Sequence, residues 1–157
     1  MPNTYTQLYI QLIFAVKGRH NLVKESFRDE IEKYICGIAK NHKHKPLAIY
    51  VMPDHLHFLI GLHPEQAISD LVRDIKSHST KFINEKKWLP QKFYWQEGFG
   101  AFSYSKSQLD TVVKYILNQP KHHHKKTFRE EYLEFLKKFE IEYDDKYLFE
   151  FIIECIL

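Results

Sequence analysis

Two short apolar segments joined by Pro53-Asp54 place the strongest constraint on how this chain folds. Residues 47–52 and 55–62 both read as strands, and a Pro-Asp dipeptide between two strands is typical of a tight turn. Because so short a connection requires the two strands to run antiparallel, they are expected to form a hairpin. Any fold for the chain must be built around this pair.

The elements before and after the hairpin follow from the spacing of apolar residues. Residues 4–16 alternate between apolar and polar side chains, which predicts a strand with one buried face. Apolar residues at helical spacing predict amphipathic helices over residues 24–42 and 68–85. The hairpin is therefore flanked by one helix on each side along the chain.

The next part of the chain predicts a last strand and a further helix. The aromatic stretch over residues 93–104 is interrupted by two glycines, which indicates a strand with a bulge or a close backbone approach. Ser107 is expected to cap a helix that continues to Asn118, and Pro120 is expected to end it. Beyond it, the pattern predicts a helix over residues 127–139 and a shorter helix or strand over 147–156.

The order of these elements predicts an α+β fold of the ferredoxin-like (RRM-like) type, βαββαβ, followed by a C-terminal helix and tail. In this arrangement an antiparallel sheet carries helices on one face, and the other face is expected to stay open. A length of 157 residues and a hydrophobic content of 44% fit a single compact domain.

Charge is distributed unevenly along the chain. Residues 1–129 hold 20 Lys and Arg against 11 Asp and Glu, whereas the remaining residues hold 3 against 9. A basic body suits a polyanionic partner such as nucleic acid, although solvated surface charge explains the same numbers. Two distant cysteines and the lack of an export or membrane segment predict a cytoplasmic protein with no membrane partner.

The strand predicted over residues 55–62 carries the first candidate site. Period-two alternation turns its apolar residues toward the helices and leaves His55 and His57 together on the expected open face. Two imidazoles at this spacing can ligate one metal ion, and the alternative is a pair of exposed, titrating histidines. We assign Asp54 to the turn; its carboxylate could alternatively accept a hydrogen bond from one histidine.

The second candidate site lies on the helix that ends before Pro120. Tyr115 points about 130° away from the apolar stripe of this helix, and Gln119, four residues later, lies within about 40° of Tyr115. A hydroxyl and a carboxamide therefore share a face that is not part of the core. A surface tyrosine and an ordinary C-terminal glutamine remain the alternative.

Together the two sites fit phosphoryl transfer. Two imidazoles and a carboxamide are neutral ligands, so a bound divalent cation would keep its full charge and act as a strong Lewis acid. A nearby cation also favours ionisation of a tyrosine, whose usual pKa is about 10. No glycine-rich phosphate-binding motif is present, so no nucleotide cofactor is expected.

Three segments of the chain keep a characteristic order and spacing over most of residues 4–130. They are Met52-Pro53-Asp54-His55-Leu56-His57-Phe58-Leu59, then Trp95-Gln96-Glu97-Gly98-Phe99-Gly100-Ala101-Phe102-Ser103, and Tyr115-Ile116-Leu117-Asn118-Gln119 followed by His122-His123. With these segments the chain resembles the single-tyrosine HUH transposases of the insertion sequence 200/605 group. The combination of the HUH pair, the aromatic block and the Tyr-x-x-x-Gln helix makes the resemblance specific.

The resemblance implies the chemistry of the site. It implies that His55, His57 and Gln119 bind Mg²⁺ or Mn²⁺. It also implies that Tyr115 cleaves single-stranded DNA and becomes attached to the 5′ phosphate. The helix that carries Tyr115 is then the C-terminal catalytic helix of the fold.

The resemblance also implies the partners and the domain division. The substrates are imperfect DNA hairpins at the ends of a mobile element, and the protein forms a homodimer in which the tyrosine helix of one chain can complete the metal site of the other. Residues 1–130 form the catalytic domain, and residues 131–157 form an acidic extension packed on the same domain.

Six basic residues are candidate DNA contacts in this interpretation. They are Arg73, Lys76 and Lys81 on the outer side of the second predicted helix, and Lys121, Lys125 and Lys126 in the basic run after Gln119. The three histidines within that run could hold DNA phosphates or lie in a solvated loop, and they are not assigned as metal ligands.

Other functions stay open at this point. A non-catalytic module that binds single-stranded nucleic acid would use the same kind of sheet without Tyr115 or a metal, although the aromatic RNA-contact motif of such modules is absent. A replication protein of a plasmid or phage, or a domesticated relative that acts on dispersed repeats, would differ only in its DNA target. A metallohydrolase would use water and leave no protein-DNA adduct.

Overall fold

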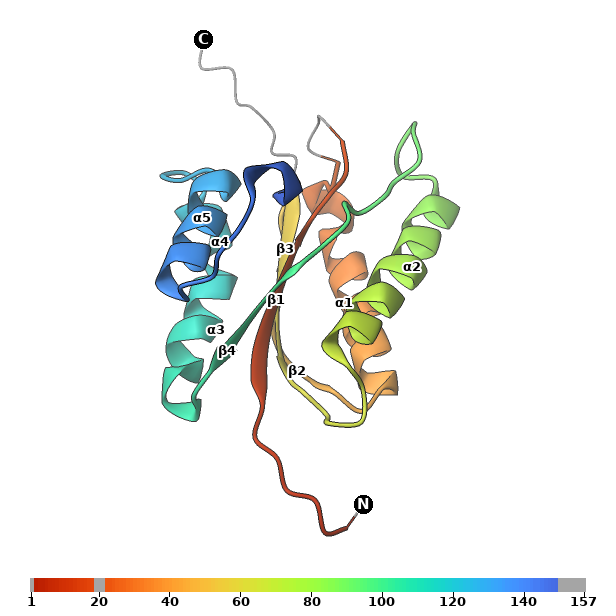
Figure 1. The fold of residues 1–157 in the computed structure, drawn as a ribbon. Helices are drawn as coiled ribbons and strands as arrows, with labels where there is room; N and C mark the ends of the chain where they lie inside the picture. The colour runs from red at the N-terminus through yellow and green to blue at the C-terminus, as the bar shows by residue number, and fades with distance from the viewer. Residues whose placement is uncertain (1, 19–21, 150–157) are drawn as a thin grey trace.

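The computed structural model describes residues 2–18 and 22–149, and its elements follow the predicted order (Figure 1). The elements are β1 (Tyr9–Ala15), α1 (Glu25–Asn41), β2 (Lys45–Val51), β3 (His55–Gly61), α2 (Ile68–Lys86), β4 (Gly100–Tyr104), α3 (Leu109–Leu117), α4 (Gln119–His122) and α5 (Phe128–Lys138). Short 3-10 turns cover Lys106–Gln108 and Asp145–Tyr147. The element predicted over residues 147–156 lies almost wholly outside the described residues.

The four strands form one antiparallel sheet in the order β2-β3-β1-β4. The predicted hairpin is β2 and β3, and it is closed at its turn by the Met52 amide, which donates to the His55 carbonyl at 2.8 Å. In the centre of the sheet Leu12 lies opposite Phe58 and Phe14 opposite Leu56. The predicted α+β class with a four-stranded antiparallel sheet is confirmed.

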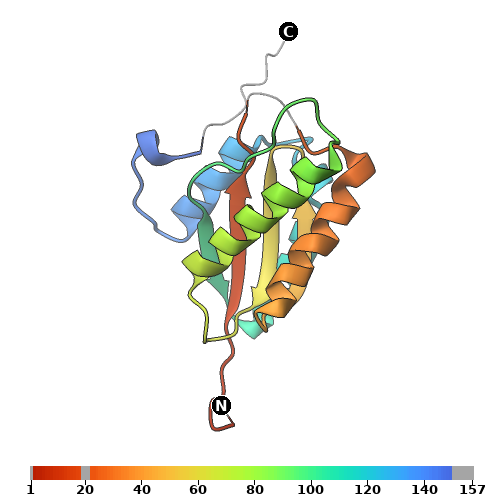
Figure 2. The same ribbon diagram turned by 90° about the vertical axis from the view of Figure 1, so that its right-hand side faces the viewer.

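The main apolar core lies between one face of the sheet and the helices α1 and α2. Figure 2 shows these two helices side by side across that face. Each helix turns its apolar stripe inward, as the helical spacing of its residues predicts. The buried side chains include Ile31, Ile35, Leu71, Ile75 and Ile83 from the helices and Leu12, Phe14, Leu56, Phe58 and Ile60 from the strands.

The second face of the sheet is also covered, so the expectation of an open face is wrong. In Figure 1, α3, α4 and α5 lie on the opposite side of the sheet from α1 and α2. Val112 and Ile116 of α3 pack on Ala48 and Leu59 in a second, smaller apolar cluster. The physical reason is that α3 has its own apolar stripe, and this face of the sheet is where the stripe is buried.

Strand β4 is shorter than the predicted strand over residues 93–104. The part before β4 meets the sheet at a single bridge between Val16 and Trp95. The Asn84 side chain of α2 accepts from the Phe93 amide at 2.7 Å and donates to the Phe93 carbonyl at 3.1 Å. These bonds tie the segment to α2, while the backbone bonds Lys17 N–H to Tyr94 O and Gln96 N–H to Ala15 O join it to the end of β1.

The boundaries of the tyrosine-bearing helix also differ from the prediction. Ser105, and not Ser107, begins the helical segment, because the Ser105 amide donates to the Gln108 side chain at 2.9 Å. Pro120 does not follow the last helical residue but lies in the first turn of α4, where a missing N–H costs nothing. The chain bends at Asn118, between α3 and α4.

Helix α5 confirms the helix predicted over residues 127–139. Thr127 caps it by accepting from the Glu130 amide, and Phe128, Tyr132 and Leu136 are buried against the rest of the protein. The helix continues across residue 130, and the predicted division there stays a prediction. Within the described ranges, no helix combines the length and the apolar character needed to cross a membrane. The cytoplasmic location stays a prediction.

At Gly100, β4 and α5 pack so closely that the effect of adding a side chain can be predicted. A Cβ at this position would meet the Tyr132 hydroxyl at 2.8 Å and the Phe102 ring at 2.9 Å. Gly100→Ala is therefore expected to lower the free energy of unfolding by about 1–3 kcal/mol, as overpacking of a core does. Urea denaturation followed by circular dichroism measures this change.

Gly37 provides the matched control, because it lies inside α1 and a Cβ there meets nothing within 4 Å. Gly37→Ala is expected to raise stability by about 0.5–1 kcal/mol through helix propensity. Equal effects of the two substitutions would contradict the close approach of α5 to Gly100.

Candidate active site

The histidine pair lies at the start of β3, on the sheet face that α3 and α5 cover. His55 pairs across the sheet with Ala15, and His57 pairs with Ile13 and Tyr50. Both side chains are fully buried, which excludes the alternative of two exposed, titrating histidines. Period-two alternation places both histidines on one face of the sheet, as predicted, but helices cover this face and bury it.

Each imidazole is held through its Nδ1 atom. Asp54 Oδ1 lies 2.7 Å from His55 Nδ1, and Gln11 Oε1 lies 2.6 Å from His57 Nδ1. Gln11 is fully buried and in turn donates from Nε2 to the Tyr104 hydroxyl at 2.7 Å. Since Nδ1 is held on both rings, the two Nε2 atoms both face the interior of the cluster, as in metal sites where outer partners orient the ligands.

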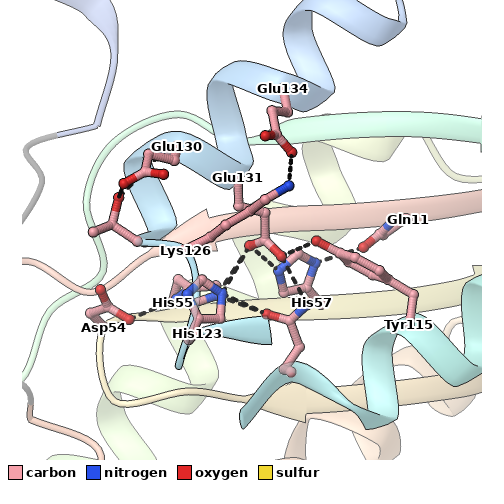
Figure 3. Close-up of polar contacts among 12 residues, drawn as sticks. Gln11, Asp54, His55, His57, Tyr115, His123, Lys126, Glu130, Glu131 and Glu134 are labelled. Carbon is pink, nitrogen blue, oxygen red and sulfur yellow. Dashed lines mark hydrogen bonds and ion pairs between the residues drawn. The ribbon is translucent and has the colours of Figure 1, made fainter. Parts of the chain in front are cut away.

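A carboxylate from α5 meets both Nε2 atoms (Figure 3). Glu131 Oε1 lies 2.9 Å from His57 Nε2 and 3.5 Å from His55 Nε2. The third imidazole around the same oxygen is that of His123, with its Nε2 atom at 3.2 Å. The four side chains offer ligand atoms that all lie within 4.8 Å of one another.

Gln119 and Tyr115 complete the same cluster. Gln119 Oε1 lies 3.2 Å from His55 Nε2, and Gln119 Nε2 donates to Glu131 Oε2 at 2.9 Å. The Tyr115 hydroxyl also donates to Glu131 Oε2. All four residues predicted as the site, His55, His57, Tyr115 and Gln119, are thus brought together around one carboxylate.

The electrostatics of the cluster follow from burial and from close opposite charges. Burial opposes the charged form of His55, but its hydrogen bonds with Asp54 and Glu131 outweigh burial and raise the pKa of His55 to about 9. Burial likewise opposes ionisation of Glu131, but the neighbouring imidazoles hold its pKa well below its usual range. Burial and the Glu131 charge raise the pKa of Tyr115 above its usual value, so its hydroxyl is a neutral donor.

The donor set suits a divalent cation. Imidazole nitrogens, a carboxylate and a carboxamide oxygen are common ligands of divalent metals, and here they converge in one buried place. The cluster can therefore hold a metal beside a tyrosine hydroxyl.

Two members of the cluster, His123 and Glu131, were missed by the sequence analysis. His123 was assigned to the basic loop, although its position four residues after Gln119 puts both side chains on one helical face, and their contact is 2.9 Å. Glu131 had no comparable local signal. It is one acidic residue in an acidic part of the chain, and only the packing of α5 brings it to the histidines.

The six candidate DNA contacts fall into two groups on opposite faces of the sheet. Lys121, Lys125 and Lys126 are exposed near the site, and Lys126 pairs with Glu134 at 2.7 Å. The other three candidates lie on α2, across the sheet from the site: Arg73, Lys76 and Lys81. The contact role of all six stays a prediction.

Lys76 differs from the other candidates because its ammonium group is already engaged. It donates to the carbonyls of Gln96 and Gly98 at 2.8 and 2.6 Å. These bonds link α2 to the aromatic block that precedes β4.

Solved structures share the fold of the chain. A crystal structure of a Deinococcus radiodurans R1 protein assigned as a transposase superposes with a TM-score of 0.60 at 25% identity, covering 74% of this chain and 94% of that one. A REP-associated tyrosine transposase bound to a REP hairpin superposes with a TM-score of 0.59 at 18% identity, covering 77% of this chain and 72% of that one. At that identity the second likeness concerns the fold alone.

Sequence comparison identifies the family. The ISDra2 transposase TnpA of Deinococcus radiodurans is 29% identical over 120 residues, which cover 72% of this chain and 84% of the relative. The profile of the family described as "Transposase IS200 like" matches residues 4–119, a segment that contains His55, His57, Tyr115 and Gln119. The chain therefore belongs to the IS200-like transposase family.

Proposed function

We propose that the chain is a transposase that cleaves and rejoins single-stranded DNA at hairpin-bearing element ends, with Tyr115 as the nucleophile. Family membership supports transposition as the class of reaction. The observation that carries the role of Tyr115 is its hydrogen bond to the carboxylate that also contacts His57. Through this contact the phenol lies next to the histidine pair. An unrelated surface tyrosine would have no such contact.

The proposed reaction is a transesterification. The Tyr115 oxygen attacks a DNA phosphorus, and a bond from phosphorus to this oxygen forms as the bond to the 3′ oxygen breaks. Tyr115 loses its proton and the departing 3′ hydroxyl gains one, so no co-substrate is consumed. The resulting 5′-phosphotyrosine conserves the energy of the phosphodiester, and a free 3′ hydroxyl can reverse the step to rejoin DNA.

The proposed cofactor is Mg²⁺ or Mn²⁺, with His55, His57 and Gln119 as ligands. When bound by these residues, a divalent cation would supply Lewis-acid polarisation of a phosphate and would favour ionisation of a nearby phenol. The fit rests on the two Nε2 atoms and the Gln119 Oε1 atom, which lie in one cluster. Asp54 and Gln11 hold the opposite edges of the two rings and thereby orient the ligands.

The proposed partner is single-stranded DNA that contains a hairpin. The REP-associated transposase was solved with a hairpin, and the present fold is similar. Lys121, Lys125 and Lys126 are proposed phosphate contacts, because they are exposed beside the site. Arg73, Lys81 and the partly engaged Lys76 could contact only DNA that passes the other face of the sheet.

We propose that the protein forms a homodimer, because the chain resembles the single-tyrosine HUH transposases. In the described chain Tyr115 contacts the cluster that contains its own His55 and His57, which supports catalysis within one chain. Exchange of the tyrosine helix between two protomers is the alternative arrangement.

The first prediction concerns Tyr115. Wild-type protein incubated with labelled hairpin-bearing single-stranded DNA and Mg²⁺ or Mn²⁺ is expected to form a covalent adduct on a denaturing protein gel. Tyr115→Phe removes the nucleophilic oxygen, so the adduct should fall to background. Tyr143→Phe is the matched control. Tyr143 is exposed and does not belong to the histidine cluster, so this variant should form the adduct like wild type.

Other outcomes of this experiment would point to the competing functions. Cleavage without an adduct would indicate a metallohydrolase. Confirmed binding of the hairpin with no reaction in the presence of either metal would indicate a binding module.

The second prediction concerns Gln119. Gln119→Ala removes a proposed ligand, so the metal concentration needed for cleavage should rise by about tenfold or more, while hairpin binding stays within about twofold. Asn118→Ala, at the neighbouring exposed position, is the control and should leave the metal titration unchanged. A metal titration of Gln119→Ala that matches wild type would remove Gln119 from the site.

A further inference from the structure

We propose that Glu131 is an additional ligand of the divalent cation and that its second carboxylate oxygen positions the hydroxyl of Tyr115. The inference rests on the proposed function, because it adds one residue to the site proposed there. Glu131 lies on α5, beyond the family-matched segment, which ends at residue 119. Helix α5 thereby belongs to the catalytic centre of this chain and is more than a surface extension.

The position of the carboxylate is the first argument. Glu131 Oε1 lies 2.9, 3.2 and 3.5 Å from the Nε2 atoms of His57, His123 and His55. Atoms that share one ion at about 2.1 Å stand roughly 3 to 4 Å from one another. These separations match both direct hydrogen bonds and the spacing of atoms that share one ion, so the oxygen lies where a common ion would be held.

The chemistry of the donors is the second argument. His55, His57 and Gln119 are neutral and supply a single oxygen among them. Mg²⁺ and Mn²⁺ favour oxygen ligands, carboxylates above all. Glu131 supplies the anionic oxygen that this set lacks. The carboxylate is only 2% exposed and already lies among imidazoles, so a bound cation would join partners that stabilise its ionised form.

The rigidity of α5 is the third argument. The Phe128 ring stacks on the His55 ring with centroids 3.9 Å apart. Tyr132 packs against Gly100 of β4, and Leu136 is buried. These contacts on both sides of Glu131 hold its carboxylate at the histidines through packing.

The two oxygens of Glu131 have different neighbours, which is the fourth argument. Oε1 faces the imidazoles, whereas Oε2 accepts from the Tyr115 hydroxyl and from Gln119 Nε2. One carboxylate therefore connects the ligand cluster with the nucleophile. Glu131 acts on Tyr115 as a positioning residue and holds the hydroxyl beside the residues that would bind the cation.

The test measures binding of Mn²⁺ alone to the full chain by calorimetry and by electron paramagnetic resonance. Glu131→Gln keeps the shape of the side chain and removes its charge, and it should weaken Mn²⁺ binding by about tenfold or more. Glu131→Asp keeps the carboxylate and should restore part of the affinity. Glu134→Gln removes the same charge one turn later on α5, outside the cluster, and should stay within about twofold of wild type.

The outcomes separate this inference from the proposed function. Tight Mn²⁺ binding by wild type, lost in His57→Ala but unchanged in Glu131→Gln, would overturn the role of Glu131 and leave the proposed metal site intact. Tighter binding by Glu131→Gln would mean that the carboxylate blocks the site and would also overturn the inference. No binding by wild type would overturn both.

A measurement on the wild-type chain tests the same contact without comparing the metal affinities of variants. In protein labelled with ¹³C at glutamate side chains, titration with Mg²⁺ should shift the Glu131 carboxyl resonance, assigned with Glu131→Asp. The shift should saturate at the Kd obtained by calorimetry. A resonance that does not move while Mg²⁺ binds would overturn the inference.

Discussion

A buried carboxylate among imidazoles is the interaction on which one half of this protein depends. Glu131 is almost completely enclosed, and burial of an ionised group is costly unless charged or polar partners surround it. Its partners come from β3, from α3 and from α4. Among the described residues, no buried side-chain nitrogen or oxygen lacks a hydrogen-bond partner. The relative placement of α5 and these elements is therefore set by polar contacts as well as by apolar packing.

The two faces of the sheet therefore differ in the kind of side chains that they bury. The face under α1 and α2 is an apolar core, and its side chains come from regular amphipathic patterns. The face under α3 and α5 mixes a small apolar cluster with the histidines, Gln11 and Glu131. Period-two alternation along β3 gives the histidines their common direction, and Tyr115 of α3 and Gln119 of α4 reach the same cluster through Glu131. An apolar core on one face thus supports the polar cluster of the candidate site on the other.

The family-matched segment and the part that follows it contribute differently to the site. Residues 4–119 contain the histidine pair, Tyr115 and Gln119. His123 and Glu131 lie outside this segment, yet their ligand atoms share the same space. The candidate site therefore combines residues inside the family-matched segment with residues that follow it.

Local patterns in the sequence determined the order of the elements, the hairpin, and the nearness of His55 to His57 and of Tyr115 to Gln119, because each depends on short-range spacing along the chain. The tertiary structure alone decided that the face with the histidines is buried, that the last strand is short, and that Glu131 joins the site. These features depend on contacts between segments far apart in sequence. Periodicity shows which side of an element is apolar, but which surface covers that side is decided only when the whole chain packs.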